Sequence, residues 1–265
     1  IKVFVSILPQ KEFVQRIGGA RVDVDVMVQP GKSPATYEPT PRQMTALSEA
    51  ELFFSIGVAF ENAFLPTLKA NLPSLAVVAT DEGIAKRTLE AHDHDDDEEH
   101  EEGAPDPHVW MDPVLVKGQA LIMRDALIAA DPAGEEVYRA GYLRFAADLD
   151  ALHTELEAIL APVKGGTLFV YHPAFGYFSD RYGLEQVAIE TGGSEPRAAQ
   201  LEEVVEHAVE EGVKVIFVQP EFPRKSAEAV AEAIGGAVVP VAPLRENYLE
   251  NLRSLALSIR EGLIK

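Results

Sequence analysis

Histidines and carboxylates gather in one stretch of the chain, residues 91–113, at a density suited to metal chemistry. Its first part sets His92, His94 and His100 among acidic residues, with no lysine, arginine or aromatic residue. Such a segment cannot bury a core, so we expect a solvated acidic loop over residues 91–104. Its imidazoles would act as weak collectors of metal ions.

The second part of the stretch reads Asp-Pro-His-Val-Trp-Met-Asp-Pro over residues 106–113. Proline fixes its own φ and restrains the residue before it, so His108 should lie on a stiff turn beside Trp110. A solvated loop rich in imidazoles followed by a rigidly held histidine predicts collection and then capture of a metal ion. An acidic surface loop next to an ordinary core histidine is the alternative interpretation.

A second candidate ligand, His172, follows an apolar run and precedes Pro173. Neutral imidazole is the commonest zinc ligand, so we predict that His108 and His172 bind a metal ion. For each, the alternative is a hydrogen-bonded structural histidine. The carboxylates at expected loop edges, where oxygen ligands could arise, are Glu38, Glu190, Glu195 and Glu221.

Composition and motifs exclude several other functions. The chain has no cysteine, which excludes thiolate metal sites and cysteine nucleophiles, and its net charge of −20 argues against nucleic acid as a partner. It lacks a phosphate-binding glycine loop, a G-x-S-x-G elbow and an H-E-x-x-H helix. We therefore predict that the protein is not an enzyme.

Strand and helix patterns alternate along the chain, which predicts an α/β fold with parallel sheets. Ligands of such sheets bind outside the carboxyl ends of the strands. In the first part we expect strands at 1–7, 22–28, 52–56 and 75–79, and helices at 9–18, 42–50, 60–71 and 114–130. In the second part we expect strands at 167–171, 185–190, 214–218 and 237–241, and helices at 172–182, 199–211, 223–234 and 246–263.

A long helix should separate the two parts. Apolar residues recur with alternating spacings of four and three, which gives one apolar stripe over residues 133–161, about 40 Å long at 1.5 Å per residue. The stripe consists of Tyr138, Tyr142, Phe145, Leu149, Leu152, Leu156 and Ile159. We therefore expect an N-terminal lobe at 1–132, a linker helix at 133–161 and a C-terminal lobe at 162–265, with the ligand in a cleft between the lobes.

Several segments in one order resemble a known family. They are SPATYEPTPRQM (33–44), the acidic histidine-rich loop, DPHVWMDP (106–113), YHPAFGYFSDRYGL (171–184), FVQPEF (217–222) and VVPVAPL (238–244). Together they resemble the solute-binding proteins that deliver zinc or manganese to ABC importers. The resemblance implies two α/β lobes bridged by one rigid helix, zinc in preference to manganese, an ABC permease as partner and a monomeric receptor. It also implies a location outside the cytoplasmic membrane, with a signal peptide already removed.

The resemblance also implies where the ligands should be. Its usual four positions correspond to Ala35, His108, His172 and Ala242, so two of them carry methyl groups. In a first interpretation Glu38 or Glu221, with water or the loop histidines, replaces the missing ligands. The residues expected to line the cleft are Ala35, Tyr37, Trp110, Glu195, Arg197, Ala242 and Arg245.

Two other interpretations remain open from the sequence. The cleft could serve a different solute, such as a chelated metal or an anion, in which case Arg197 and Arg245 would matter more than the histidines. An enzyme or a storage protein with an open two-histidine site is the third. The histidine-rich loop favours the first interpretation, because such a loop has little use without a metal.

Overall fold

The computed structural model describes residues 1–89, 103–190 and 197–264. Contacts divide the chain into two compact units, each made of separate stretches. Unit 1 comprises Ile1–Ile84, Pro113–His153 and Leu244–Leu249, and unit 2 comprises Ala85–Asp112, Thr154–Pro243 and Glu250–Lys265. By these contacts residues 85–112 group with unit 2, and the lobes expected at 1–132 and 162–265 remain predictions.

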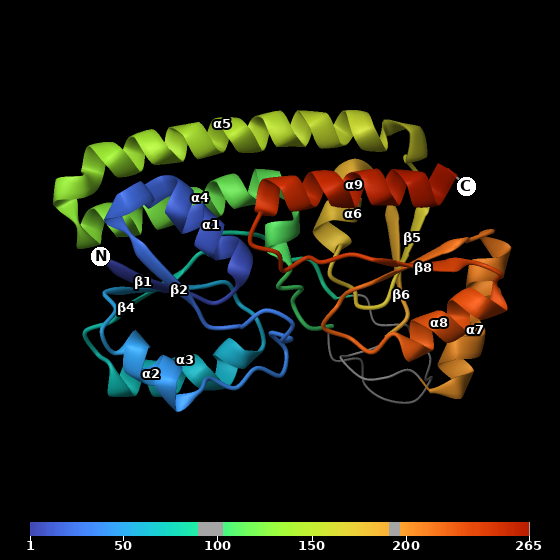
Figure 1. The fold of residues 1–265 in the computed structure, drawn as a ribbon, viewed down its shortest axis with the longest axis horizontal. Helices are drawn as coiled ribbons and strands as arrows, with labels where there is room; N and C mark the ends of the chain where they lie inside the picture. The colour runs from blue at the N-terminus through green and yellow to red at the C-terminus, as the bar shows by residue number, and fades with distance from the viewer. Residues whose placement is uncertain (90–102, 191–196, 265) are drawn as a thin grey trace. The chain divides into compact units, whose positions relative to one another are not determined.

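Unit 1 contains a four-stranded parallel sheet in the order β2-β1-β3-β4 (Figure 1). Its strands are β1 (Lys2–Val5), β2 (Asp23–Val26), β3 (Leu52–Ser55) and β4 (Ala76–Ala79). Its helices are α1 (Leu8–Gly18), η1 (Gly19–Arg21), α2 (Pro41–Leu47), α3 (Phe60–Asn71), α4 (Pro113–Ala130) and η3 (Pro132–Gly134). The expected strand–helix alternation is thus confirmed for this unit.

Unit 2 repeats this topology with a four-stranded parallel sheet in the order β6-β5-β7-β8. Its strands are β5 (Thr167–Val170), β6 (Glu185–Ala188), β7 (Val215–Val218) and β8 (Ala237–Pro240). Its helices are η2 (Val109–Met111), η4 (Ala161–Val163), α6 (Gly176–Tyr182), α7 (Ala198–Glu210), α8 (Lys225–Ala233) and most of α9 (Tyr248–Ile264). Parallel strands buried on both faces read as continuous apolar runs, and all four residues of β7 are buried.

The long helix predicted from the apolar stripe is α5 (Glu135–Leu160), which continues from unit 1 into unit 2 at His153. Five stripe residues are buried and the other two, Tyr142 and Ile159, are half-buried. The buried ones are Tyr138, Phe145, Leu149, Leu152 and Leu156. Among the helices described, none is long and apolar enough to span a membrane.

One helix begins later than the sequence suggested. Residues 172–182 were expected to be helical, whereas α6 starts at Gly176. The residue before a proline avoids the helical region, and this keeps His172 out of the helix. In addition, the Phe175 N–H donates to Oε1 of Gln186 at 2.7 Å, so this part of the turn bonds to the neighbouring strand. His172 therefore lies in the turn between β5 and α6.

Two helix glycines predict opposite responses to alanine. A Cβ on Gly141 of α5 would lie 2.9 Å from the Arg16 carbonyl oxygen and closer still to that of Ile17, both backbone atoms of α1. A Cβ on Gly118 of α4 would meet no atom within 4 Å. We expect Gly141→Ala to lower the free energy of unfolding by about 1–3 kcal/mol, and Gly118→Ala to raise it by about 0.5–1 kcal/mol. Urea unfolding followed by circular dichroism measures both free energies of unfolding. An equal change in the two variants would contradict the close approach of α5 to α1 at Gly141.

Candidate functional site

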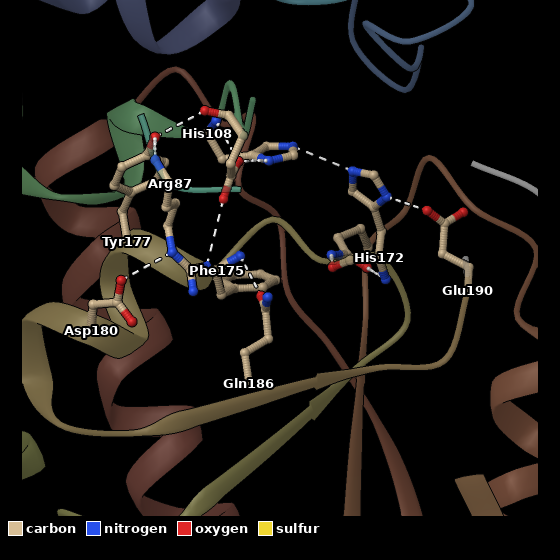
Figure 2. Close-up of polar contacts among 10 residues, drawn as sticks. Arg87, His108, His172, Phe175, Tyr177, Asp180, Gln186 and Glu190 are labelled. Carbon is tan, nitrogen blue, oxygen red and sulfur yellow. Dashed lines mark hydrogen bonds and ion pairs between the residues drawn. The ribbon is translucent and has the colours of Figure 1, made fainter. Parts of the chain in front are cut away.

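The two predicted histidine ligands lie together at the carboxyl edge of the unit 2 sheet. His172 comes two residues after β5, Glu190 two residues after β6, and Gln219 directly after β7. Neighbouring parallel strands end at the same edge of a sheet, which brings these side chains together. His108 reaches the same place from the 106–112 turn, and Figure 2 shows its ring facing that of His172.

The Asp106-Pro107-His108 turn is fixed by its own aspartate. Oδ1 of Asp106 accepts the backbone N–H of His108 at 2.9 Å, an Asx turn, and also the ring Nδ1–H of His108 at 2.7 Å. The helix η2 follows at once, with the Met111 N–H donating to the His108 carbonyl at 3.0 Å. The turn therefore determines both the backbone of His108 and the direction of its ring.

His172 is held by two neighbouring strand ends. Its backbone N–H donates to Oε1 of Gln219 at 3.2 Å, and Nε2 of Gln219 donates back to its carbonyl at 2.7 Å. Its ring Nδ1–H donates to Oε1 of Glu190 at 2.6 Å, and the ring stacks on Phe222 with centroids 4.7 Å apart. Both the backbone and the ring of His172 are thus restrained by groups of the protein itself.

The consequence is that the two imidazoles meet through their remaining nitrogens. A carboxylate accepts, so in the neutral rings each Nδ1 carries the proton and each Nε2 presents a lone pair. These Nε2 atoms lie 3.3 Å apart. Two lone pairs at this distance repel one another, and a cation between them relieves the repulsion. Burial lowers the pKa of His108, against the opposing effect of Asp106, and so favours the neutral ring that a metal requires.

This separation fits a tetrahedral zinc ion. With Zn–N bonds of about 2.0–2.1 Å and a tetrahedral angle, two nitrogen ligands lie about 3.3–3.4 Å apart. The carboxylates Asp106 and Glu190, at 0 and 3% exposure, are the outer partners that histidine ligands of metals usually have. Within the described part of the chain, no group of three or more His, Asp or Glu side chains is arranged to hold a metal. The pair supplies two nitrogen ligands.

The remaining predicted residues of unit 2 within the described ranges are Trp110, Ala242, Glu221 and Arg197. The Trp110 ring lies 5.1 Å from that of His108, and its Nε1–H donates to the Pro243 carbonyl at 3.1 Å, beside the half-buried Ala242. Glu221 is half-buried, and this burial raises the pKa of its carboxyl group. Arg197 is exposed at the start of α7.

Other predicted residues lie in unit 1 or outside the described residues. Ala35, Glu38 and Arg245 are exposed in unit 1, and the Tyr37 hydroxyl donates to Oε1 of Gln43 at 2.8 Å. The predictions for Glu38, Ala35, Tyr37 and Arg245 as site residues remain predictions. The residues outside the described ranges are His92, His94, His100 and Glu195.

Sequence reasoning missed the supports of the two histidines. From the sequence, Asp106 was expected only as part of the proline turn, and Gln219 was given no role. An aspartate two residues before a histidine and a glutamine directly after a buried strand were the available signals. Neither signal identifies its partner, because Gln219 meets His172 across 47 residues of chain.

The fold and the site together define a two-unit α/β protein with a histidine pair suited to a divalent metal ion. The family model "Zinc-uptake complex component A periplasmic" (ZnuA) matches residues 3–262. The chain belongs to this ZnuA family.

One solved structure is similar to this chain in fold, and two further proteins are similar to it in sequence. A crystal structure of ZnuA superposes with a TM-score of 0.92 at 36% identity, covering 99% of this chain and 98% of that one. The "High-affinity zinc uptake system protein ZnuA" of Bacillus subtilis (strain 168) is 28% identical over 89% of this chain and 76% of its own length. The "Zinc-binding protein AdcA" of Streptococcus pyogenes serotype M3 is 28% identical over 92% of this chain. The chain spans about half the length of AdcA, 50%.

The carboxylate supports predict a defined ring tautomer that can be tested without metal. In Glu190→Ala the His172 ring loses its acceptor, so we expect the Nδ1–H form of His172 to decline while that of His108 persists. Long-range ¹H–¹⁵N spectra of the metal-free protein measure both rings. The control is Glu185→Ala, an exposed carboxylate at the start of the same strand, which should leave both rings unchanged. An unaltered His172 signal in Glu190→Ala would contradict the assigned hydrogen bond.

Proposed function

We propose that the protein is the zinc-binding component of an ABC importer, which captures the ion with His108 and His172 and delivers it to a membrane permease. The observation that carries this proposal is the 3.3 Å separation of the two Nε2 atoms, each on a ring whose other nitrogen is held by a buried carboxylate. The names of the relatives, zinc uptake and zinc-binding proteins, support zinc as the transported ion.

The other parts of the proposal follow from the family. Its periplasmic description supports action outside the cytoplasmic membrane. That the protein acts as a monomeric receptor and not as an enzyme is part of the same proposal. A receptor must release its cargo, and few protein ligands with open positions favour release over permanent retention. The comparisons do not favour a site converted to another solute.

Glu221 is our candidate to add an oxygen ligand. It follows the end of β7, it is half-buried, and it lies close enough to His172 for an electrostatic interaction. Glu38, predicted from the sequence for the same role, is exposed in unit 1. The positions that the resemblance gives to ligands, Ala35 and Ala242, cannot bind a metal through their methyl groups.

Zinc calorimetry tests the histidine pair directly. We expect one tight site in the wild-type chain, and we expect His108→Ala/His172→Ala to weaken it on the order of 100-fold or more, because both nitrogen ligands are lost. His153→Ala, on α5, is the control and should bind as the wild type does.

The loop histidines require a matched background. The same measurements are made in His92→Ala/His94→Ala/His100→Ala, with and without the site substitutions, so that weak binding by residues 91–104 is removed. A tight site that persists after His108→Ala/His172→Ala in this background would reject the assignment.

A second experiment identifies the oxygen ligand. We expect Glu221→Gln to lower zinc affinity about tenfold, because an amide oxygen is a poorer ligand than a carboxylate and carries no charge. Glu228→Gln, an exposed change on the following helix, controls for net charge. Glu38→Gln is measured in parallel, and a larger loss there than in Glu221→Gln would transfer the role to Glu38.

A further inference from the structure

A short antiparallel ladder leads into the aspartate that supports His108. The Leu89 N–H donates to the Ala104 carbonyl at 2.9 Å, and the Asp106 N–H donates to the Arg87 carbonyl at 2.8 Å. Thr88 and Pro105 form the bridge between them. The backbone of Asp106 is thus fixed by the backbone of Arg87, which lies 19 positions earlier in the chain.

Helix α6 holds this ladder from the side. The buried Tyr177 hydroxyl accepts the Arg87 N–H at 3.1 Å and donates to the Asp106 carbonyl at 2.9 Å, as Figure 2 shows. One side chain of α6 therefore contacts both strands of the ladder. Because His172 precedes this helix by four residues, the ladder and the turn of His172 share a common support.

The Arg87 side chain occupies the space beside the Asp106 carboxylate. Its Nη1 lies 3.7 Å from Oδ2 of Asp106, and its Nε lies 3.0 Å from Oδ2 of Asp180. The guanidinium lies directly over Gly176, where a Cβ would overlap Nη1 and lie 3.1 Å from Oδ2 of Asp106. Only glycine at position 176 leaves room for this arrangement.

The two oxygens of Asp106 have different surroundings. Oδ1 accepts both hydrogen bonds from His108, whereas Oδ2 accepts none from the described residues. Asp106 is fully buried, at 0% exposure. A buried carboxylate needs a compensating charge, and Arg87 supplies it at the oxygen that His108 leaves unused.

We propose that Arg87 is a positioning residue for the metal site, with Gly176 as the space that admits its guanidinium. Attraction between Arg87 and Oδ2 directs Oδ1 at the Nδ1–H of His108, and this points Nε2 of His108 at His172. Arg87 acts through Asp106 and does not contact the metal. The inference rests on the proposed function only where zinc affinity is the readout.

Four variants of the full chain test the proposal. Arg87→Met removes the positive charge but keeps much of the side-chain length. Gly176→Ala displaces the guanidinium while position 87 remains an arginine. Arg87→Lys keeps a cation in place. Asp180→Asn, whose carboxylate is 62% exposed, removes the outer partner of Arg87 and is the matched control.

Three measurements are made on each variant: the thermal unfolding midpoint, the His108 and His172 Nδ1–H signals of the metal-free protein, and zinc affinity by calorimetry. We expect Arg87→Met and Gly176→Ala to lose the His108 Nδ1–H signal, to keep that of His172, and to bind zinc about tenfold more weakly. Arg87→Lys should restore most of the signal and affinity, and Asp180→Asn should match the wild type.

Several outcomes would overturn the inference. An unchanged His108 signal in folded Arg87→Met and Gly176→Ala would remove the positioning role. Equal changes at His108 and His172, or loss of folding in both variants, would assign Arg87 to general stability instead. Absence of zinc binding by the wild type would reject the proposed function alone, because the ring signals of the metal-free protein would still decide the role of Arg87.

Discussion

The site depends on one unfavourable contact, the approach of two imidazole Nε2 lone pairs to 3.3 Å. Without other contacts, two neutral imidazole rings would rotate apart or form an N–H···N hydrogen bond. Here each ring is tied on its far side, His108 to Asp106 and His172 to Glu190, by charge-assisted hydrogen bonds of 2.7 and 2.6 Å. These bonds hold the two nitrogens at a distance where a divalent cation between them would remove the repulsion. Preorganisation of this kind lowers the cost of ordering the ligands when the ion binds.

The parallel sheet of unit 2 supplies most of this restraint. Strands β5, β6 and β7 end at the same edge of the sheet, and each is followed by one residue of the site. These residues are His172, its ring partner Glu190, and Gln219, which hydrogen-bonds to the His172 backbone. The fourth exit, after β8, carries Pro243, whose carbonyl accepts the Trp110 N–H. The apolar runs of the strands, buried on both faces, thus fix polar groups that lie far apart in sequence.

Much of the fold could be predicted from local patterns, because strand alternation and the apolar stripe of α5 are visible within a few residues. His108 and His172 could be proposed from their proline neighbours in the same way. The pairing of His172 with Glu190 could not, because 18 residues separate them, and neither could the contact of Arg87 with Tyr177, which are 90 residues apart. Long-range pairing of that kind is decided by the register of the sheet. The grouping of residues 85–112 with unit 2 could not be predicted either, since the ladder and the Tyr177 hydrogen bonds leave no local signal.

The restraint of the two rings bears directly on metal affinity. Affinity for a metal ion depends on the number of ligands and on how well they are held before binding. The described part of this site offers two imidazoles, so the orientation of each ring contributes to the affinity. The depth of support behind His108 fits this need: an Asx turn, a buried carboxylate and the Arg87 cation beyond it stand in series. Each of these contacts restrains the group that follows it, and together they fix the orientation of the His108 ring.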